Sequence, residues 1–180
     1  MLTISTQQYN QSLLSKLGTR HQRQPLSGIW ELTHHCNLKC VHCYCEKTPG
    51  KNELSLNEAK NIINQIVEAG CLWLTFTGGE IFQRPDFPDI YTYAKSKGLI
   101  ITLLTNGTLI TESVVRHLVE HPPSLIEITL YGRTQETYEK ITRANGSYEQ
   151  CLKAIRLLRQ YEIPFLLKTM LLTLNQHELW

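Results

Sequence analysis

The sequence contains no long hydrophobic run and no strong excess of either charge. None of its apolar stretches approaches the ~20 residues that span a bilayer, and its N-terminus lacks the apolar region of a signal peptide. Its 18 Lys and Arg residues nearly balance its 16 Asp and Glu residues, which leaves a net charge of +2. The short basic run at residues 20–23 gives no reason to expect the clustered positive surface that binds nucleic acid. We therefore expect a cytoplasmic protein that contacts neither membrane nor nucleic acid.

Cysteine is the informative exception, because six are present and three of them lie close together. In the reducing cytoplasm cysteines stay as thiols, so a cluster of them indicates metal or redox chemistry rather than disulfides. The cluster is the stretch "CNLKCVHC", which places Cys36, Cys40 and Cys43 at C-x3-C-x2-C spacing. Cys71 and Cys151 lie in apolar patterns, and we expect both to be core residues.

Beyond a polar leader at residues 1–27, short aliphatic and β-branched runs alternate with helical patterns. The runs predict strands at 29–33, 72–77, 99–104, 125–130 and 165–172. Helices are predicted at 56–69, 88–97, 111–119 and 147–159, and the first and last of them carry capping boxes that start at Ser55 and Ser147. Near-continuous apolar strands linked by helices are typical of an α/β fold with a parallel sheet. A (βα) barrel and a doubly wound open sheet both fit this order.

The end of the sequence interrupts this alternation. Residues 175–178 have the pattern of a first helical turn, yet the sequence stops at Trp180. An apolar fifth strand without a covering helix is unusual in such folds. We therefore interpret residues 28–180 as a core domain that is incomplete at its C-terminus and belongs to a longer protein.

Candidate functional residues follow the ends of the predicted strands, where both architectures bind their ligands. The cysteine cluster follows the first strand, Thr77-Gly78-Gly79-Glu80 follows the second, and Asn106 follows the third. Thr129 closes the fourth strand. Tyr131 and Lys168 either fill the barrel or reach a substrate, and the sequence leaves both possibilities open.

Three neighbouring thiolates suit two kinds of metal site. A [4Fe–4S] cluster held by three cysteines keeps one iron free for an outside ligand. A structural zinc site would need a fourth ligand, which Cys45 or His42 could supply. The C-x3-C-x2-C spacing matches neither the paired C-x2-C units of zinc sites nor the ferredoxin patterns.

Two motifs together are similar to those of a known family. "CNLKCVHC" resembles the cluster loop of the radical S-adenosylmethionine (SAM) enzymes, and "TGGE" resembles the second motif of that family. The resemblance implies a partial (βα)6 TIM-like barrel, of which about five βα units are present. It also implies that Cys36, Cys40 and Cys43 ligate three irons of a [4Fe–4S] cluster. The amino and carboxylate groups of SAM would then chelate the fourth iron.

The same resemblance implies which residues surround SAM. Gly78 and Gly79 let the backbone approach its methionine part, and Glu80 either accepts hydrogen bonds from its ammonium group or holds the loop. Arg143 adjoins the position, Thr142, at which some members carry an arginine that meets the SAM carboxylate. The remaining candidates are His42 and Tyr44 near the adenine, and Asn106 and Thr129 facing the pocket.

The resemblance further implies a reductive radical reaction. An external one-electron reductant such as flavodoxin or ferredoxin reduces the cluster, SAM is cleaved to a 5′-deoxyadenosyl radical, and this radical abstracts hydrogen from a substrate. The segment "EITLYGRTQETYEKITRANGSYEQCLKAIRLLR" resembles the oxidoreductases that modify peptides and proteins, including ribosomal peptide and sulfatase maturases. Those enzymes usually carry a cysteine-rich SPASM or twitch extension, which this sequence lacks. Two alternatives stay open: a truncated, inactive remnant, and a non-catalytic module that holds zinc or an iron–sulfur cluster.

Overall fold

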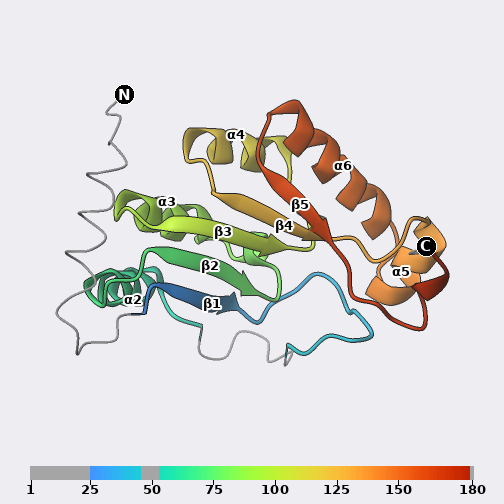
Figure 1. Ribbon diagram of the computed structural model, residues 1–180, viewed down its shortest axis with the longest axis horizontal. Coiled ribbons are helices and arrows are strands. Elements are labelled where there is room, and N and C mark those ends of the chain that lie inside the picture. Colours follow the sequence, from blue (N-terminus) through green and yellow to red (C-terminus); the bar gives the residue numbers. More distant parts are fainter. Residues whose placement is uncertain (1–24, 46–52, 179–180) are drawn as a thin grey trace.

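A single parallel sheet organises the molecule. The computed structural model describes residues 25–45 and 53–178 of the 180-residue chain. Most of the predicted leader lies outside these ranges. The five arrows in Figure 1 point the same way, and every neighbouring pair of strands is parallel. The strands are β1 Ser27–Thr33, β2 Trp73–Gly78, β3 Ile100–Thr105, β4 Leu125–Thr129 and β5 Phe165–Lys168.

The order of the strands distinguishes between the two architectures that the sequence allows. Each strand pairs with its successor, in the order β1-β2-β3-β4-β5. A doubly wound sheet would instead reverse its strand order at a switch point. The sequential order is that of an opened (βα) barrel, so the predicted parallel, TIM-like architecture is confirmed.

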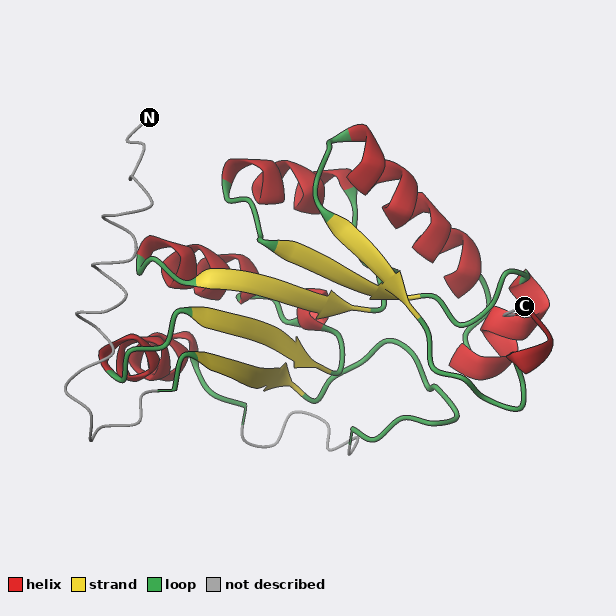
Figure 2. Cartoon of the chain, viewed as in Figure 1, coloured by secondary structure: helices red, strands yellow, loops and turns green. Residues whose placement is uncertain are grey.

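Helices cover one face of the sheet and build the core against it. They are α2 Leu56–Glu68, α3 Phe87–Ser96, α4 Glu112–Glu120, α5 Gln135–Thr142 and α6 Ser147–Gln160, with short 3-10 turns η1 at Ile81–Gln83 and η2 at Gln176–Glu178. Alternate strand residues, such as Phe76, Leu103 and Ile128, are fully buried in one cluster with Ile63 of α2 and Leu158 of α6. In Figure 2, α5 lies beyond the arrowheads of the strands, next to the beginning of α6.

No helix of the described residues covers the opposite face of the sheet. Side chains in a strand alternate between the two faces, so the neighbours of the buried residues point away from the helices. Ile29 on β1 is 75% exposed and Trp73 on β2 is 38% exposed, although both are large and apolar. This exposed face continues directly toward the strand ends where the candidate residues lie.

Several local predictions are corrected by the structure. The capping box at Ser55 is present, but Ser147 caps nothing: Gly146 is the N-cap, with a left-handed φ of 77°. The buried Ser147 hydroxyl instead donates to the Ala144 carbonyl oxygen at 2.6 Å and pairs with the Thr142 hydroxyl at 2.8 Å, so its partners precede the helix. Strand β5 ends at Lys168 rather than at Leu172, and residues 176–178 form a 3-10 turn rather than an α-helix. Helix α5 was not predicted. Within the described ranges, no helix is both long and apolar enough to cross a bilayer.

Candidate functional site

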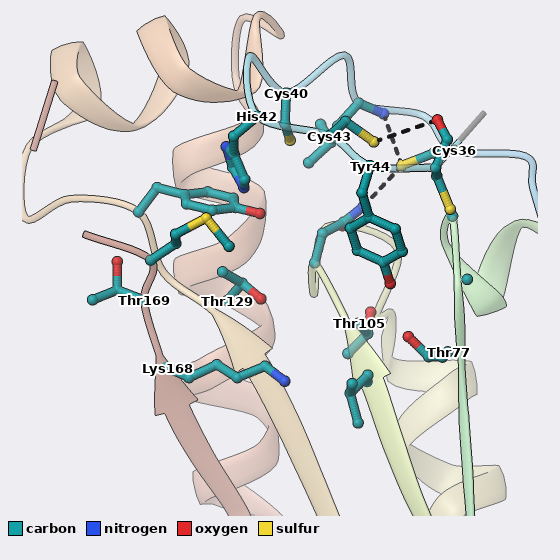
Figure 3. A pocket seen from close by; sticks show the side chains of 18 residues that line it. Cys36, Cys40, His42, Cys43, Tyr44, Thr77, Thr105, Thr129, Lys168 and Thr169 are labelled. Carbon is teal, nitrogen blue, oxygen red and sulfur yellow. Dashed lines mark hydrogen bonds between the residues drawn. The ribbon is translucent and has the colours of Figure 1, made fainter. Parts of the chain in front are cut away.

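A cavity of about 330 Å³ opens at the carboxyl ends of the strands, directly beneath the cysteine loop. Figure 3 shows the loop residues on one side of the cavity and side chains from β2, β3, β4 and β5 on the other. A space of this size is in the range of small-molecule sites. The predicted residues that line it are Cys36, Cys40, His42, Cys43, Tyr44, Gly78, Gly79, Asn106 and Thr129.

The cysteine loop is held in place by the C-terminus of α5. The Lys39 amide donates to the Thr142 carbonyl oxygen at 3.0 Å, and the Val41 amide donates to the Ile141 carbonyl oxygen at 2.9 Å. The last carbonyl groups of a helix have no partner within the helix. The last carbonyl oxygens of α5 therefore accept hydrogen bonds from the backbone between the cysteines. The local sequence does not predict this contact between the loop and α5.

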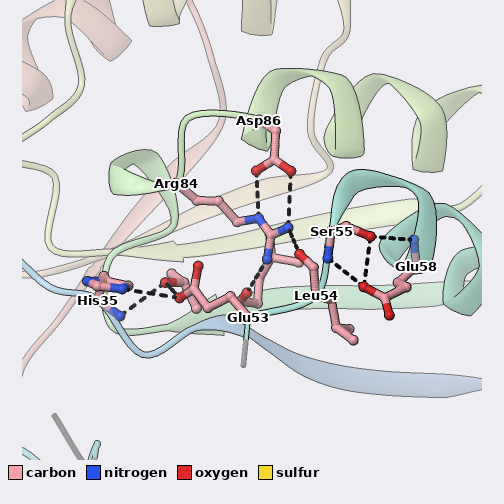
Figure 4. Close-up of polar contacts among 9 residues, drawn as sticks. His35, Glu53, Leu54, Ser55, Glu58, Arg84 and Asp86 are labelled. Atoms are coloured by element: carbon pink, nitrogen blue, oxygen red, sulfur yellow. Dashed lines mark hydrogen bonds and ion pairs between the residues drawn. The ribbon is translucent and has the colours of Figure 1, made fainter. Parts of the chain in front are cut away.

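The two ends of the same loop are tied together by Arg84, which is only 5% exposed (Figure 4). Its Nη1 donates to the Leu32 carbonyl oxygen at 3.0 Å, where β1 leads into the loop. Its Nη2 donates to the Leu54 carbonyl oxygen, just before α2 begins. Asp86 holds the guanidinium from the other side through a bidentate pair of 2.7 and 3.1 Å. Arg84 thus fixes the distance between the entry and the exit of the cysteine loop.

Gly78 and Gly79 are required because the end of β2 touches the backbone of this loop. A Cβ on Gly78 would lie 2.2 Å from the Thr33 carbonyl oxygen, and one on Gly79 would lie 2.1 Å from the His35 carbonyl oxygen. Gly78 also has a φ of 128°, which side chains rarely adopt. The Gly79 amide donates to Thr33 at 2.7 Å, so the second motif is joined directly to the first.

Glu80 lies beneath the cavity rather than on its wall. Its side chain is fully buried and accepts from the Thr105 hydroxyl at 2.7 Å and from the Asn106 amide at 2.8 Å. Burial raises the pKa of this carboxyl, and the hydrogen bonds it accepts oppose that rise. Of its two proposed roles, the contacts present are those that hold a loop, here the one that follows β3.

Asn106 connects that loop to the first cysteine. Its Nδ2 lies 3.8 Å from the Cys36 Sγ and donates to the Asn37 Oδ1 at 3.0 Å. Its Oδ1 accepts from the Thr108 amide at 2.9 Å, which fixes the orientation of the amide group. A buried acid, an asparagine and a thiol therefore form one continuous polar path across the strand ends.

Burial disfavours the thiolate form of two of the three cysteines. Cys36 and Cys40 are half-buried, and Cys43 is exposed. Burial, and secondarily the neighbouring Cys36, raise the pKa of Cys40 to about 11, and burial also raises the pKa of Cys36. The Cys36 and Cys40 thiols are therefore protonated at neutral pH, so a metal that binds them must displace their protons.

His42 has a buried ring nitrogen that is available for a hydrogen bond. Its ring packs edge-on against Tyr131, with centroids 4.9 Å apart. Its Nδ1 is buried and has no hydrogen-bond partner among the described residues. Buried polar atoms in folded proteins are nearly always satisfied, so this nitrogen fits a hydrogen bond to a bound group. Burial also lowers the pKa of His42, which favours the neutral ring that can accept such a bond.

Other lining residues were only partly anticipated. Tyr131 and Lys168, whose roles the sequence left open, both line the cavity. The Lys168 Nζ lies 2.6 Å from the Glu127 Oε2 across the β4–β5 pair. The Tyr44 ring extends from the loop toward Thr77 and Thr105, as Figure 3 shows. Thr77, Thr105, Thr169 and Met170 also line the cavity without having been singled out as ligands.

Arg143 is the predicted site residue that the structure places apart. It is the C-cap of α5, in a left-handed conformation with a φ of 53°, and it is not among the described residues that line the cavity. Its amide closes the helix by donating to Glu139 at 2.8 Å. In this structure the Arg143 side chain does not line the cavity, so it is not placed to bind the carboxylate of SAM there.

The C-terminal segment secures the other end of α5. Glu178 is 7% exposed, and its carboxylate accepts from the Arg133 amide and from the hydroxyls of Thr134 and Thr137. Gly132 leaves the necessary space, since a Cβ there would lie 2.8 Å from the Glu178 Oε2. Glu178 thereby anchors the N-terminus of the helix whose C-terminus holds the cysteine loop.

Comparison with known proteins places these features in a family. The radical SAM superfamily model matches residues 30–180. The chain is 35% identical over 152 residues to an AdoMet-dependent heme synthase of Methanosarcina barkeri, covering 83% of this chain and 44% of that protein. It is 34% identical over 148 residues to the subtilosin biosynthesis protein AlbA of Bacillus subtilis, covering 81% and 33%. The chain thus spans less than half the length of either relative.

Solved structures agree on the fold. The Streptococcus suis protein SuiB, in its complex with S-adenosylmethionine, aligns with a TM-score of 0.64 at 17% identity, covering 96% of this chain and 49% of SuiB. Identity this low supports the architecture alone. The family match over residues 30–180 agrees with the three-cysteine loop and with the Gly78-Gly79 motif that is hydrogen-bonded to it. The chain belongs to the radical SAM superfamily, whose members use a [4Fe–4S] cluster and SAM.

Proposed function

We propose that this chain is the core of a radical SAM enzyme that modifies a peptide or protein. The observation that carries the proposal is the convergence of three cysteines and the Gly78-Gly79 backbone on one cavity at the strand ends. The thiols of Cys36, Cys40 and Cys43 would hold the cluster, and the cavity below them would take SAM. When bound, these groups supply a one-electron reductive cleavage that yields a 5′-deoxyadenosyl radical able to abstract hydrogen.

The residues of the chain position and shield these groups. The three thiols lose their protons as they bind iron, and the α5 carbonyl groups keep the loop between them in one conformation. The buried His42 Nδ1 can accept a hydrogen bond from an adenine amino group, and Tyr131 supports its ring. Asn106 can donate to a cluster sulfur or a SAM oxygen from its fixed orientation. Loop and strand side chains line the cavity that would take these groups.

A substrate has room to approach from the open face of the sheet. Ile29 and Trp73 are exposed there, and the Lys168–Glu127 pair lies at its carboxyl end. The likeness to AlbA, a bacteriocin biosynthesis protein, supports a peptide. The likeness to a heme synthase gives a tetrapyrrole as the competing class. We place the reaction in the cytoplasm, with flavodoxin or ferredoxin as the electron donor.

The proposal is tested by SAM cleavage. The chain is reconstituted anaerobically with iron and sulfide, reduced with dithionite, and assayed for 5′-deoxyadenosine. We expect slow, uncoupled cleavage that Cys40→Ala abolishes, because this chain spans less than half the length of its curated relatives and we propose that the remainder helps to shield the radical. A chain that holds its cluster but forms no 5′-deoxyadenosine would support the inactive remnant. Fast substrate turnover by these 180 residues would contradict the incomplete core.

The substrate class is tested by isotope transfer. A short peptide gene adjacent to the gene for this chain would supply the candidate, synthesised with deuterium at its side chains. Deuterium that appears in 5′-deoxyadenosine supports the peptide class. Deuterium transfer from a labelled porphyrin, with none from the peptide, would contradict it.

A further inference from the structure

A second group of metal-binding side chains lies on the last turn of α4, in the stretch His117-Leu118-Val119-Glu120-His121. One ligand atom from each of His117, Glu120 and His121 lies within 4.8 Å of the other two. Residues three and four apart share one face of a helix, which explains why these side chains meet. The two imidazole rings are 5.1 Å apart between centroids. Neither the family match nor the cysteine chemistry accounts for this group.

The donor set is that of a zinc site. Two imidazole nitrogens and one carboxylate oxygen occur together in zinc centres that keep a position open, and imidazole also suits nickel and copper. A tetrahedral ion with bonds near 2.1 Å separates its ligands by about 3.4 Å. The three ligand atoms all lie within 4.8 Å of one another, and Glu120 is exposed, so its carboxylate has room to turn toward an ion. The partial negative charge of the helix C-terminus also favours a cation there.

Neighbouring residues from α3 hold the two histidines in place. The Thr92 Oγ1 lies 3.2 Å from the His117 Nε2, within hydrogen-bond distance. When Nε2–H donates to Thr92, the Nδ1 of His117 carries the lone pair that a metal needs. The Tyr91 hydroxyl donates to the His121 carbonyl oxygen at 2.6 Å, which fixes the backbone where the helix ends. Metal-bound histidines characteristically have such partners on the second ring nitrogen.

We propose that His117, Glu120 and His121 bind one divalent transition-metal ion of the zinc class, with Thr92 orienting His117. The site lies at the opposite end of the sheet from the cysteine loop, because α4 ends just before β4 begins whereas the cysteines follow the end of β1 (Figure 1). Its ion therefore does not reach the cavity. It joins the end of α4 to α3 through Thr92 and stabilises the fold, a role independent of the proposed SAM chemistry.

The test must separate this site from the cysteine loop. The full chain with Cys36, Cys40, Cys43 and Cys45 changed to Ser loses the thiols of the loop and keeps α4 intact. Isothermal titration calorimetry of this chain with zinc chloride is expected to show about one ion per chain. The same ion should raise Tm, because a ligand that binds only the folded state stabilises it.

Point variants in that background assign the ligands. We expect His117→Ala and His121→Ala to abolish binding and Glu120→Gln to weaken it. Thr92→Val removes only the orienting hydroxyl and should weaken binding about tenfold or more. His177→Ala is the matched control, because His177 also has a carboxylate neighbour, Glu178 at 3.7 Å, but lies outside α4.

Two results would overturn the proposal. One is a chain without loop thiols that takes up no zinc, and the other is an affinity that the α4 variants leave unchanged. Glu120 is exposed, so Glu120→Gln should keep the fold. Its zinc affinity therefore still tests the proposal if a histidine variant unfolds. An unchanged affinity in Thr92→Val would refute the orientation that we assign to His117.

Discussion

Replacing Arg84 with methionine should destabilise the protein by opening the base of the cysteine loop. Methionine keeps most of the apolar stem but removes the guanidinium that binds the carbonyl oxygens of Leu32 and Leu54. It also leaves Asp86, whose side chain is 27% exposed, without its cation. Removing one partner of a buried ion pair costs about 3–5 kcal/mol. The partial exposure of Asp86 favours the lower end, about 3 kcal/mol.

The expected loss can be measured as a change in Tm. For a domain of this size, 1 kcal/mol corresponds to about 2–4 °C, so Arg84→Met should lower Tm by about 6–12 °C in circular dichroism melts. The Tm of Arg84→Lys should lie between those of wild type and Arg84→Met. An ammonium group keeps the charge but cannot bind both carbonyl oxygens and Asp86 with the geometry of a guanidinium.

A matched control removes an arginine whose ion pair is exposed. The Arg116 side chain is 69% exposed and pairs with Glu112 at 2.9 Å within α4. Exposed pairs contribute about 0–1 kcal/mol, so Arg116→Met should change Tm by no more than about 4 °C. Equal melting temperatures for the Arg84 and Arg116 variants would refute the assignment of Arg84 as the tie between the loop ends. So would full retention of iron by an Arg84→Met chain that does melt early.

Three further variants test individual contacts. Gly79→Ala should cost about 1–3 kcal/mol and lower iron uptake, because its Cβ would lie 2.1 Å from the His35 carbonyl oxygen; Gly28→Ala, whose Cβ would come no closer than 3.6 Å to the Leu74 side chain, should keep its iron. Burial alone would raise the pKa of Glu178, but the hydrogen bonds it accepts lower that pKa from 4.5 to about 2. The extra stability of wild type over Glu178→Gln should therefore be complete above pH 4.5 and shrink as the pH falls toward 2 in urea titrations; a pH-independent difference would contradict this. His42→Ala should retain iron but bind SAM about tenfold more weakly, the loss of about one hydrogen bond, and unchanged SAM affinity would remove His42 from the site.

The sequence predicted what depends on local pattern and on spacing. The five strands could be placed because aliphatic runs alternate with helical periodicity, and the cavity could be located because parallel strands share one carboxyl edge. Cys36, Cys40 and Cys43 were singled out by their spacing and Asn106 by its place after a strand end, and all four line the cavity.

The features that could not be predicted join distant parts of the chain. Arg84 lies after the glycine motif, and no local signal shows that its guanidinium reaches carbonyl groups on both sides of the cysteine loop. Glu178 resembles a residue of an opening helix, yet its carboxylate anchors α5 instead. The capping box predicted at Ser147 was wrong because the helix begins one residue earlier, with Gly146 as its N-cap in a left-handed conformation. The four-residue pattern Ser147–Gln150 carries no information about the conformation of Gly146.

The central claim is that the three-cysteine site is left incomplete so that SAM can fill it. It is tested most directly by counting iron and SAM on the same chain after anaerobic reconstitution and desalting. We predict about four irons and about one SAM per chain, with both lost together in each of Cys36→Ala, Cys40→Ala and Cys43→Ala. A colourless chain whose three cysteines hold zinc, or SAM binding that survives loss of the cysteines, would contradict the account.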